Sequence, residues 1–160
     1  MRGGTYSDFY RYDCVTNTWT VLASLPVGVV NPSNCVVAKG SVFVLAGNVY
    51  DPAVGDYVPS TLFLRYSIAE NKWYSASYAP YTTSAGALVY DGVDTIYSLA
   101  GNASPYIMKY SISTDTWSTM LSLHVTTMYG GLVYYVSQAI GALLVIRRGL
   151  GTTEWFIYKL

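Results

Sequence analysis

A tyrosine and a tryptophan spaced seven residues apart occur three times along this chain of 160 residues. In every copy a basic residue directly precedes the tyrosine, and the pairs are Tyr12 with Trp19, Tyr66 with Trp73, and Tyr110 with Trp117. The second and third pairs lie 44 residues apart, and the first and second lie 54 apart. Periods of roughly 20 to 50 residues mark repeat architectures, in which each unit packs against its neighbours. The chain is therefore predicted to fold as a row of similar units.

Glycines form a second landmark, which stands nine residues before the tyrosine in most copies. These glycines are Gly3 with Gly4, Gly47, Gly101 and Gly149. Gly47 is the exception, because ten additional residues separate it from Tyr66. Gly149 precedes Tyr158 in a fourth copy that has no matching tryptophan. The base period is thus near 44, with an insertion in the second copy.

Each full unit contains the pattern of four β-strands. Two short apolar runs flank a tight turn with glycine at its second position, which supplies the positive φ that a hairpin requires. A third segment alternates between apolar and polar residues, and a fourth begins at the tryptophan. The predicted first three strands are 35–38, 42–45 and 63–68 in one unit, and 87–90, 95–99 and 107–112 in the next. No segment shows a helical period, so the chain is predicted to be all-β.

The composition excludes several classes of protein. Hydrophobic residues make up 52% of the chain, yet no apolar run approaches the roughly 18 residues that span a bilayer, so no membrane insertion is expected. Nine basic and nine acidic residues are scattered, without the positive field that nucleic-acid binding uses. Seventeen tyrosines with few lysines favour an extracellular or virion surface over the cytoplasm, without identifying the compartment.

A glycine doublet after a hydrophobic run, then a tyrosine, then a tryptophan seven residues later resembles the Kelch repeat. The resemblance covers essentially the whole chain and implies one four-stranded propeller blade per unit. It implies a single partial β-propeller domain made of a half-blade at about 3–25, blades at about 33–79 and 84–123, and an incomplete blade at about 128–160. It also implies that the tyrosines and tryptophans pack between neighbouring blades. The copies depart from the pattern at Asn48, Asn102 and Arg148, where the second glycine belongs.

The predicted strands number thirteen, fewer than the sixteen that four closed blades contain. The strands around Tyr12 and Tyr158 would also compete for one position in a closed ring. We therefore expect one of two situations: a second copy associates to close the ring, or the chain is part of a longer propeller. Exposed strand edges would otherwise favour aggregation.

Candidate binding residues lie on loops. The connections between the second and third strands, and those between blades, open on the same face of a propeller, and binding residues concentrate on such loops. Tyrosine offers a large rigid contact with a polar tip. The candidates on this face are Tyr50, Asp51, Asp56, Tyr57 and Tyr106. The pair Arg147-Arg148 is a candidate for a phosphate, sialic acid or carboxylate, with a solvated strand end as the simpler reading.

Motifs for catalysis are not evident. Copper oxidases on Kelch-like rings need several histidines, and His124 is the only one here. Cys14 and Cys35 have no metal or redox spacing and are expected to be small, at least half-buried thiols, or else a disulfide. Residues 113–117 approach the Asp-box of sialidases but lack its glycine. No enzymatic activity, cofactor or metal is expected.

The sequence therefore favours a non-catalytic interaction or structural module that docks a protein partner or joins a larger assembly. A glycan-binding module of an adhesin or viral receptor-binding protein is the alternative. A sugar-processing enzyme of the sialidase or epimerase type, with a site completed by a second chain, is the third.

Overall fold

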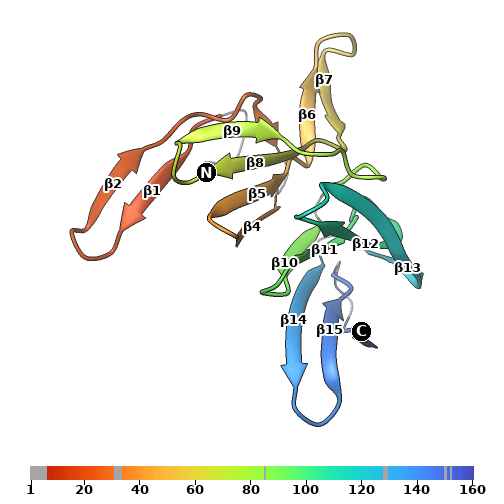
Figure 1. The fold of residues 1–160 in the computed structure, drawn as a ribbon. Coiled ribbons are helices and arrows are strands. Elements are labelled where there is room, and N and C mark those ends of the chain that lie inside the picture. The colour runs from red at the N-terminus through yellow and green to blue at the C-terminus, as the bar shows by residue number, and fades with distance from the viewer. Residues whose placement is uncertain (1–6, 31–33, 85, 128–129, 150, 152) are drawn as a thin grey trace.

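Within the residues that the computed structural model describes there are sixteen β-strands and no helix (Figure 1). These residues are 7–30, 34–84, 86–127, 130–149, 151 and 153–160. The chain is all-β, as the sequence predicted. Among the described residues, no helical segment has the length and apolar character that crossing a bilayer requires.

Four antiparallel sheets follow the sequence repeat and are called here the half-blade and the second, third and fourth blades. The half-blade pairs β1 (Tyr10–Asp13) with β2 (Thr18–Val21). The second blade has the order β4 (Asn34–Ala38), β5 (Ser41–Leu45), β8 (Phe63–Ser67), β9 (Lys72–Ser75). The third has the order β10 (Ala87–Tyr90), β11 (Thr95–Leu99), β12 (Ser104–Ser111), β13 (Thr116–Thr127). The fourth has β14 (Gly131–Ser137), β15 (Gly141–Arg147) and β16 (Trp155–Lys159).

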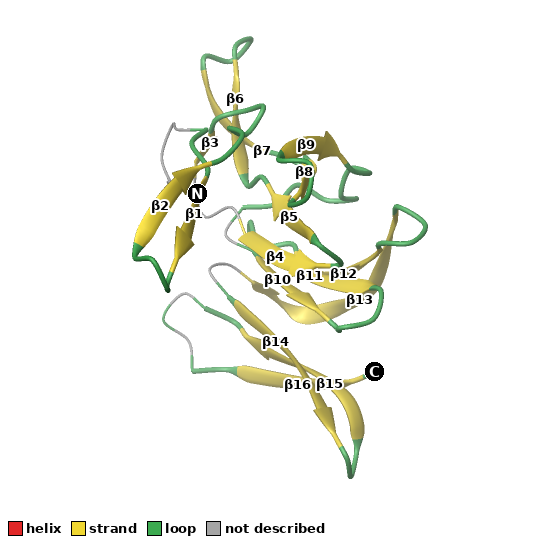
Figure 2. Cartoon of the chain, turned by 60° about the vertical axis from the view of Figure 1, so that its left-hand side comes forward, coloured by secondary structure: helices red, strands yellow, loops and turns green. Residues whose placement is uncertain are grey.

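These sheets follow one another along an arc, with the half-blade and the fourth blade at its two ends (Figures 1 and 2). This is the arrangement of a partial β-propeller. Side chains alternate between the two faces of each strand, so each inner sheet buries one face against the preceding sheet and the other against the next. Three separate apolar clusters result, one at each junction between neighbouring sheets. The core is therefore a series of interfaces between sheets.

The ten-residue insertion differs from the sequence prediction, which treated it as a loop. It forms a hairpin of β6 (Asn48–Asp51) and β7 (Asp56–Pro59), and β6 also pairs with β3 (Val29–Val30). These three strands account for the difference between thirteen predicted strands and sixteen observed. The insertion folds as a hairpin because Val49 and Tyr50 face Val58 and Tyr57 across a turn in which Gly55 has a φ of 73°.

The glycine landmark marks backbone that turns through positive φ. Gly47, Gly101 and Gly149 have φ angles of 69°, 65° and 83°. Asn102, where the repeat has its second glycine, has a φ of 50°, a conformation that asparagine tolerates better than most residues. Gly3 and Gly4 lie outside the described residues.

Both cysteines differ from their expected burial. Cys14 and Cys35 are free thiols and both are exposed. Cys14 lies in the turn between β1 and β2, and Cys35 alternates outward on β4, so neither is drawn into an apolar cluster.

Candidate functional site

The repeated spacing of tyrosine and tryptophan produces a repeated contact between blades. Phe9 of the half-blade lies against Tyr66 and Trp73 of the second blade, with ring centroids 4.8 and 5.2 Å away. Phe63, at the same repeat position, lies 4.9 Å from both Tyr110 and Trp117 of the third blade. An aromatic ring from one blade is thus wedged against the tyrosine and tryptophan of the next.

Hydrogen bonds reinforce each of these contacts. Asn71 accepts bonds from the Tyr66 hydroxyl at 2.7 Å and from the backbone N–H of Ala23 at 2.9 Å. The Trp73 indole N–H donates to the carbonyl of the same Ala23 at 2.8 Å. One polar side chain and one indole therefore bind both backbone groups of a single residue that follows the last strand of the preceding sheet.

The third blade repeats this set of bonds with an aspartate. Asp115 accepts from the Tyr110 hydroxyl at 2.6 Å and from the backbone N–H of Ser77 at 2.9 Å, and Trp117 donates to the Ser77 carbonyl at 2.8 Å. Burial works against ionisation of Asp115, but the bonds from Ser77 and Tyr110 hold its pKa below the usual value. Burial and the bond to Asp115 raise the pKa of Tyr110. The aspartate is thus a charged acceptor between two blades.

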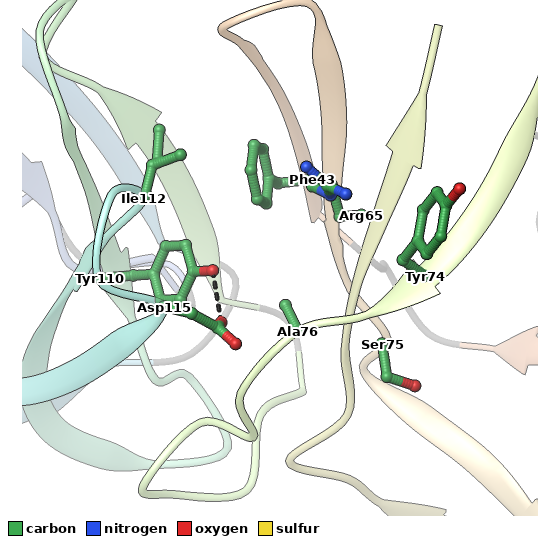
Figure 3. Close-up of a pocket in the computed structure, with 8 residues that line it drawn as sticks. All are labelled: Phe43, Arg65, Tyr74, Ser75, Ala76, Tyr110, Ile112 and Asp115. Atoms are coloured by element: carbon green, nitrogen blue, oxygen red, sulfur yellow. Dashed lines mark hydrogen bonds between the residues drawn. The ribbon is translucent and has the colours of Figure 1, made fainter. Parts of the chain in front are cut away.

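A cleft of about 230 Å³ opens beside this contact, between the second and third blades (Figure 3). Arg65 lies at its wall with its guanidinium carbon 5.0 Å from the ring centroid of Tyr74, and Asp115 lies across from it. A second cleft, of about 340 Å³, occupies the matching place between the half-blade and the second blade. Asp115 is hydrogen-bonded to Ser77 and Tyr110, so Arg65 is the charged group at this cleft that does not join the two blades.

The tyrosines predicted for binding fall into two ring pairs. Tyr50 and Tyr57 face each other across the β6–β7 hairpin with centroids 5.4 Å apart, and the Tyr50 side chain is 53% exposed. Tyr106 stacks on Tyr81 at 4.2 Å with the rings nearly parallel. The hairpin and the Tyr81 segment are joined where Thr83 donates its backbone N–H to Ser60 at 2.8 Å. Both pairs therefore belong to connected segments at one end of the blades.

Three comparisons with known proteins bear on this arrangement. The family model of the Kelch motif matches residues 2–26. The solved structure of YjhT shares the fold with a TM-score of 0.67 at 16% sequence identity, over 88% of this chain. The chain is a partial β-propeller built from Kelch-like blades. It spans 50% of the length of the YjhT chain, and no curated protein matches it in sequence.

The two aspartates predicted for binding accept hydrogen bonds from the backbone of their own hairpin turn. Asp51 accepts the backbone N–H of Ala53 at 2.9 Å, and Asp56 accepts that of Tyr57 at 2.7 Å. Their carboxylates support the hairpin tip. Of the two tyrosines on the hairpin, Tyr50 is exposed and Tyr57 is half-buried.

The predicted arginine pair belongs to a different part of the Kelch-type fold. Arg147 is the last residue of β15 in the fourth blade, and Arg148 directly follows that strand. Arg148 is bound to Glu154 at 2.5 Å and to the carbonyl of Thr126 at 3.2 Å, while Arg147 is exposed opposite Trp155. The bond to Thr126 places Arg148 at the end of β13, which pairs with β12, the strand that carries Tyr106.

The remaining blade-motif residues lie at the two ends of the arc. Tyr12 and Trp19 contact each other at 4.9 Å but are 42% and 70% exposed, and Tyr158 is 39% exposed. His124 is exposed and lies edge-on to Phe156 at 5.3 Å. Among the described residues, no group of three or more His, Cys, Asp or Glu side chains is placed to hold a metal.

Sequence reasoning missed the partners of the motif. Asn71 and Asp115 each stand five residues after the tyrosine of their repeat. Asn17 stands five residues after Tyr12 and accepts a hydrogen bond from the Tyr12 hydroxyl at 2.5 Å. All three have positive φ, between 50° and 54°. The signal was present as an Asn or Asp at a fixed offset, and in the third copy it was read as an incomplete Asp-box.

Proposed function

We propose that this Kelch-type chain is a non-catalytic interaction module, and that it docks a protein partner through the β6–β7 hairpin. The observation that carries the proposal is the hairpin itself, which projects from the second blade with Tyr50 at its surface (Figure 1). The blades beneath it are fixed by aromatic wedges and by backbone hydrogen bonds. A rigid scaffold that presents tyrosines on a protruding element is typical of a recognition surface.

A protein partner is favoured over a glycan by the free strand edge of the hairpin. Asp51 and Asp56 each accept a backbone N–H of the turn through one carboxylate oxygen. The hairpin's outer strand, β7, is an edge strand of the order β3-β6-β7, and edges of this kind support strand addition by a peptide.

Affinity capture with the purified chain tests the proposal. We expect wild type to capture a discrete partner, and the double variant Tyr50→Ala with Tyr57→Ala to lose it by about thirtyfold in affinity, as the loss of interface tyrosines typically does. Val93→Ser is the matched control, since Val93 is 72% exposed in the β10–β11 turn, away from the hairpin. A partner that binds both variants equally would overturn the assignment to the hairpin.

Two further measurements address the competing functions. A glycan array should give no binding that depends on Tyr50 and Tyr57; dependent hits would replace the protein partner with a sugar. Incubation with a panel of sialosides and hexoses should give no turnover. Turnover by the purified chain would contradict a non-catalytic role.

A further inference from the structure

The two ends of the arc carry exposed aromatic faces that correspond to the two halves of an internal blade junction. The N-terminal face is the outer side of the half-blade, and the C-terminal face is the outer side of the fourth blade. In the described part of the chain no strand covers either face. The N-terminal face consists of Tyr10, Tyr12, Trp19 and Val21, and the C-terminal face of Val133, Tyr135, Trp155 and Ile157.

The register of the strands assigns these side chains to outward faces. Tyr12 pairs with Trp19 across the half-blade. In the fourth blade the even-numbered residues of each strand pack on the third blade, and Phe156 is one of them. Because neighbouring residues of a strand point to opposite faces, Trp155 and Ile157 point away from the third blade. They are 61% and 70% exposed.

Trp155 stands at the repeat position of the aromatic wedge. It lies three residues before Tyr158, as Phe9 does before Tyr12 and Phe63 before Tyr66. Phe63 is fully buried against the tyrosine and tryptophan of the next blade. The C-terminal face thus presents a wedge with no tyrosine and tryptophan to receive it.

The N-terminal face presents the receiving half. Tyr12 and Trp19 correspond to Tyr66 and Trp73, which receive Phe9. Trp19 is 70% exposed because, within the described ranges, no aromatic ring of another blade packs against it, as Phe9 does against Trp73. Large exposed apolar side chains grouped on one face mark interaction sites.

The residue two positions after the wedge is apolar in the fourth blade and basic in the other copies. The three other copies have a basic residue directly before the tyrosine, namely Arg11, Arg65 and Lys109. The fourth blade has Ile157 there. The exposed face of the fourth blade is therefore more apolar than the corresponding faces of the internal blades.

We propose that the C-terminal face of one copy packs on the N-terminal face of a second copy, with Trp155 wedged against the partner copy's equivalent of the Tyr12 and Trp19 pair. The contact repeats the internal junction of Phe63 with Tyr110 and Trp117 between two chains. It is head to tail, so it closes a ring or extends a row according to the angle between copies. This goes beyond the proposed function, since it uses neither Tyr50 nor Tyr57.

The contact between copies is weaker than an internal junction. Internally, the tryptophan and the Asn or Asp of one blade bind the backbone of Ala23 or Ser77 in the fourth-strand region of the blade before it. The described fourth blade has three strands and supplies no such region. The association therefore rests on aromatic packing and depends on protein concentration.

Light scattering coupled to size exclusion, over a range of concentrations, tests the proposal with the 160-residue chain. We expect wild type to show a mass of at least twice the 17.5 kDa of one chain. Trp155→Ser and Trp19→Ser should each be monomeric alone. An equimolar mixture should form a one-to-one dimer, because Trp19→Ser keeps an intact C-terminal face and Trp155→Ser keeps an intact N-terminal face.

Three controls separate this contact from other effects. Tyr78→Ser removes an exposed aromatic outside both faces and should leave the mass unchanged. The double variant at Tyr50 and Tyr57 should also associate as wild type does, which keeps this test independent of the hairpin. Ile157→Lys restores the basic residue of the other copies, so it should fold normally and weaken association by about tenfold or more.

Specific outcomes would overturn the proposal. A wild-type chain that stays monomeric at every concentration contradicts it, as does a mixture of Trp19→Ser and Trp155→Ser that does not pair. Association of Ile157→Lys at wild-type strength contradicts it too. Circular dichroism of each variant verifies that a loss of association is not a loss of fold.

Discussion

The indole N–H of Trp117 in the third blade donates to the backbone carbonyl of Ser77 in the second blade, 2.8 Å away. Ser77 also donates its own N–H to Asp115. Both backbone groups of Ser77 are therefore bound by side chains of the third blade. Trp73 and Asn71 bind Ala23 in the same way. Backbone groups depend little on side-chain identity, so the preceding blade is free to vary in sequence at this position while the contact is kept.

This contact predicts that the acceptor at residue 115 stabilises the fold. Asp115→Ala removes bonds from Tyr110 and Ser77 and places alanine at a φ of 51°, so we expect unfolding to become easier by about 2–4 kcal/mol. Asp115→Asn keeps the acceptor and matches Asn71, so its cost should be below about 1 kcal/mol. Urea unfolding of the three proteins measures the difference. Equal losses for Ala and Asn would show that the charge, and not the acceptor, matters.

Acid should destabilise the chain through a second link between the same two blades. Asp94 of the third blade accepts bonds from Lys39 of the second blade and from Ser111 and Ser113, and these hold its pKa well below the usual 3.8. Because the pKa is lower in the folded state, ionised Asp94 stabilises the fold above pH 3.8, and this contribution is lost as the pH falls below that value.

Thermal unfolding between about pH 6 and pH 2 checks this expectation. The melting temperature of wild type should fall more steeply below pH 4 than that of Asp94→Asn, which has no carboxylate to protonate there. Asp56→Asn removes one carboxylate from the β6–β7 hairpin, away from the blade junctions, and serves as the control. Parallel profiles for Asp94→Asn and wild type would refute the role of Asp94.

The sequence repeat revealed the blades but not what joins them. Tyr66 and Trp73 were recognised because their aromatic spacing recurs, and the strands around them follow from hydrophobic patterning. Asn71 escaped notice because Asn and Asp are common in turns for local reasons, so a single polar residue at a fixed offset carries little signal. The β6–β7 hairpin escaped because it has no counterpart in the other copies, although its apolar residues are symmetric about Gly55.

Gly86 is predicted to be intolerant of any side chain. A Cβ atom there would lie 2.2 Å from the carbonyl oxygen of Leu99, which is backbone and not free to move away. Gly86→Ala should therefore lower the free energy of unfolding by more than about 3 kcal/mol or prevent folding. Gly131→Ala is the control, since its Cβ would meet the nearest atom, of Arg147, at an ordinary 3.8 Å. A Gly86→Ala protein as stable as Gly131→Ala would show that the sheets shift apart at little cost.

Phe63 and Trp155 occupy one repeat position in two different environments. Phe63 is fully buried between two blades, so Phe63→Ala should cost about 3–5 kcal/mol. Trp155 is 61% exposed, so Trp155→Ala should change the unfolding free energy of the dilute chain by less than about 1 kcal/mol. Chemical denaturation at low concentration, where copies do not associate, makes the comparison. A large loss for Trp155→Ala under those conditions would mean that its side chain already packs within its own chain.

Removing the hairpin should separate binding from folding. Deletion of residues 49–58 restores the nine-residue spacing from Gly47 to the tyrosine that the third blade shows between Gly101 and Tyr110. The deletion removes all but one residue of β6 and all but one of β7, so β3 loses most of its partner strand, and buried Val29 loses its contact with Val49. We expect a loss of about 1–3 kcal/mol in stability, the usual cost of exposing one core aliphatic residue, with the β-sheet circular dichroism spectrum retained.

The same deletion should abolish capture of the protein partner, since it removes both Tyr50 and Tyr57, and should leave the association of copies through Trp155 unchanged. A matched control keeps the hairpin but replaces both tyrosines with phenylalanine, which preserves the ring contact at 5.4 Å and removes only the hydroxyl groups. If the phenylalanine protein still captures the partner, the rings carry the binding. If the deletion protein captures it as well, the partner binds elsewhere on the propeller and the hairpin is only a structural addition to the second blade.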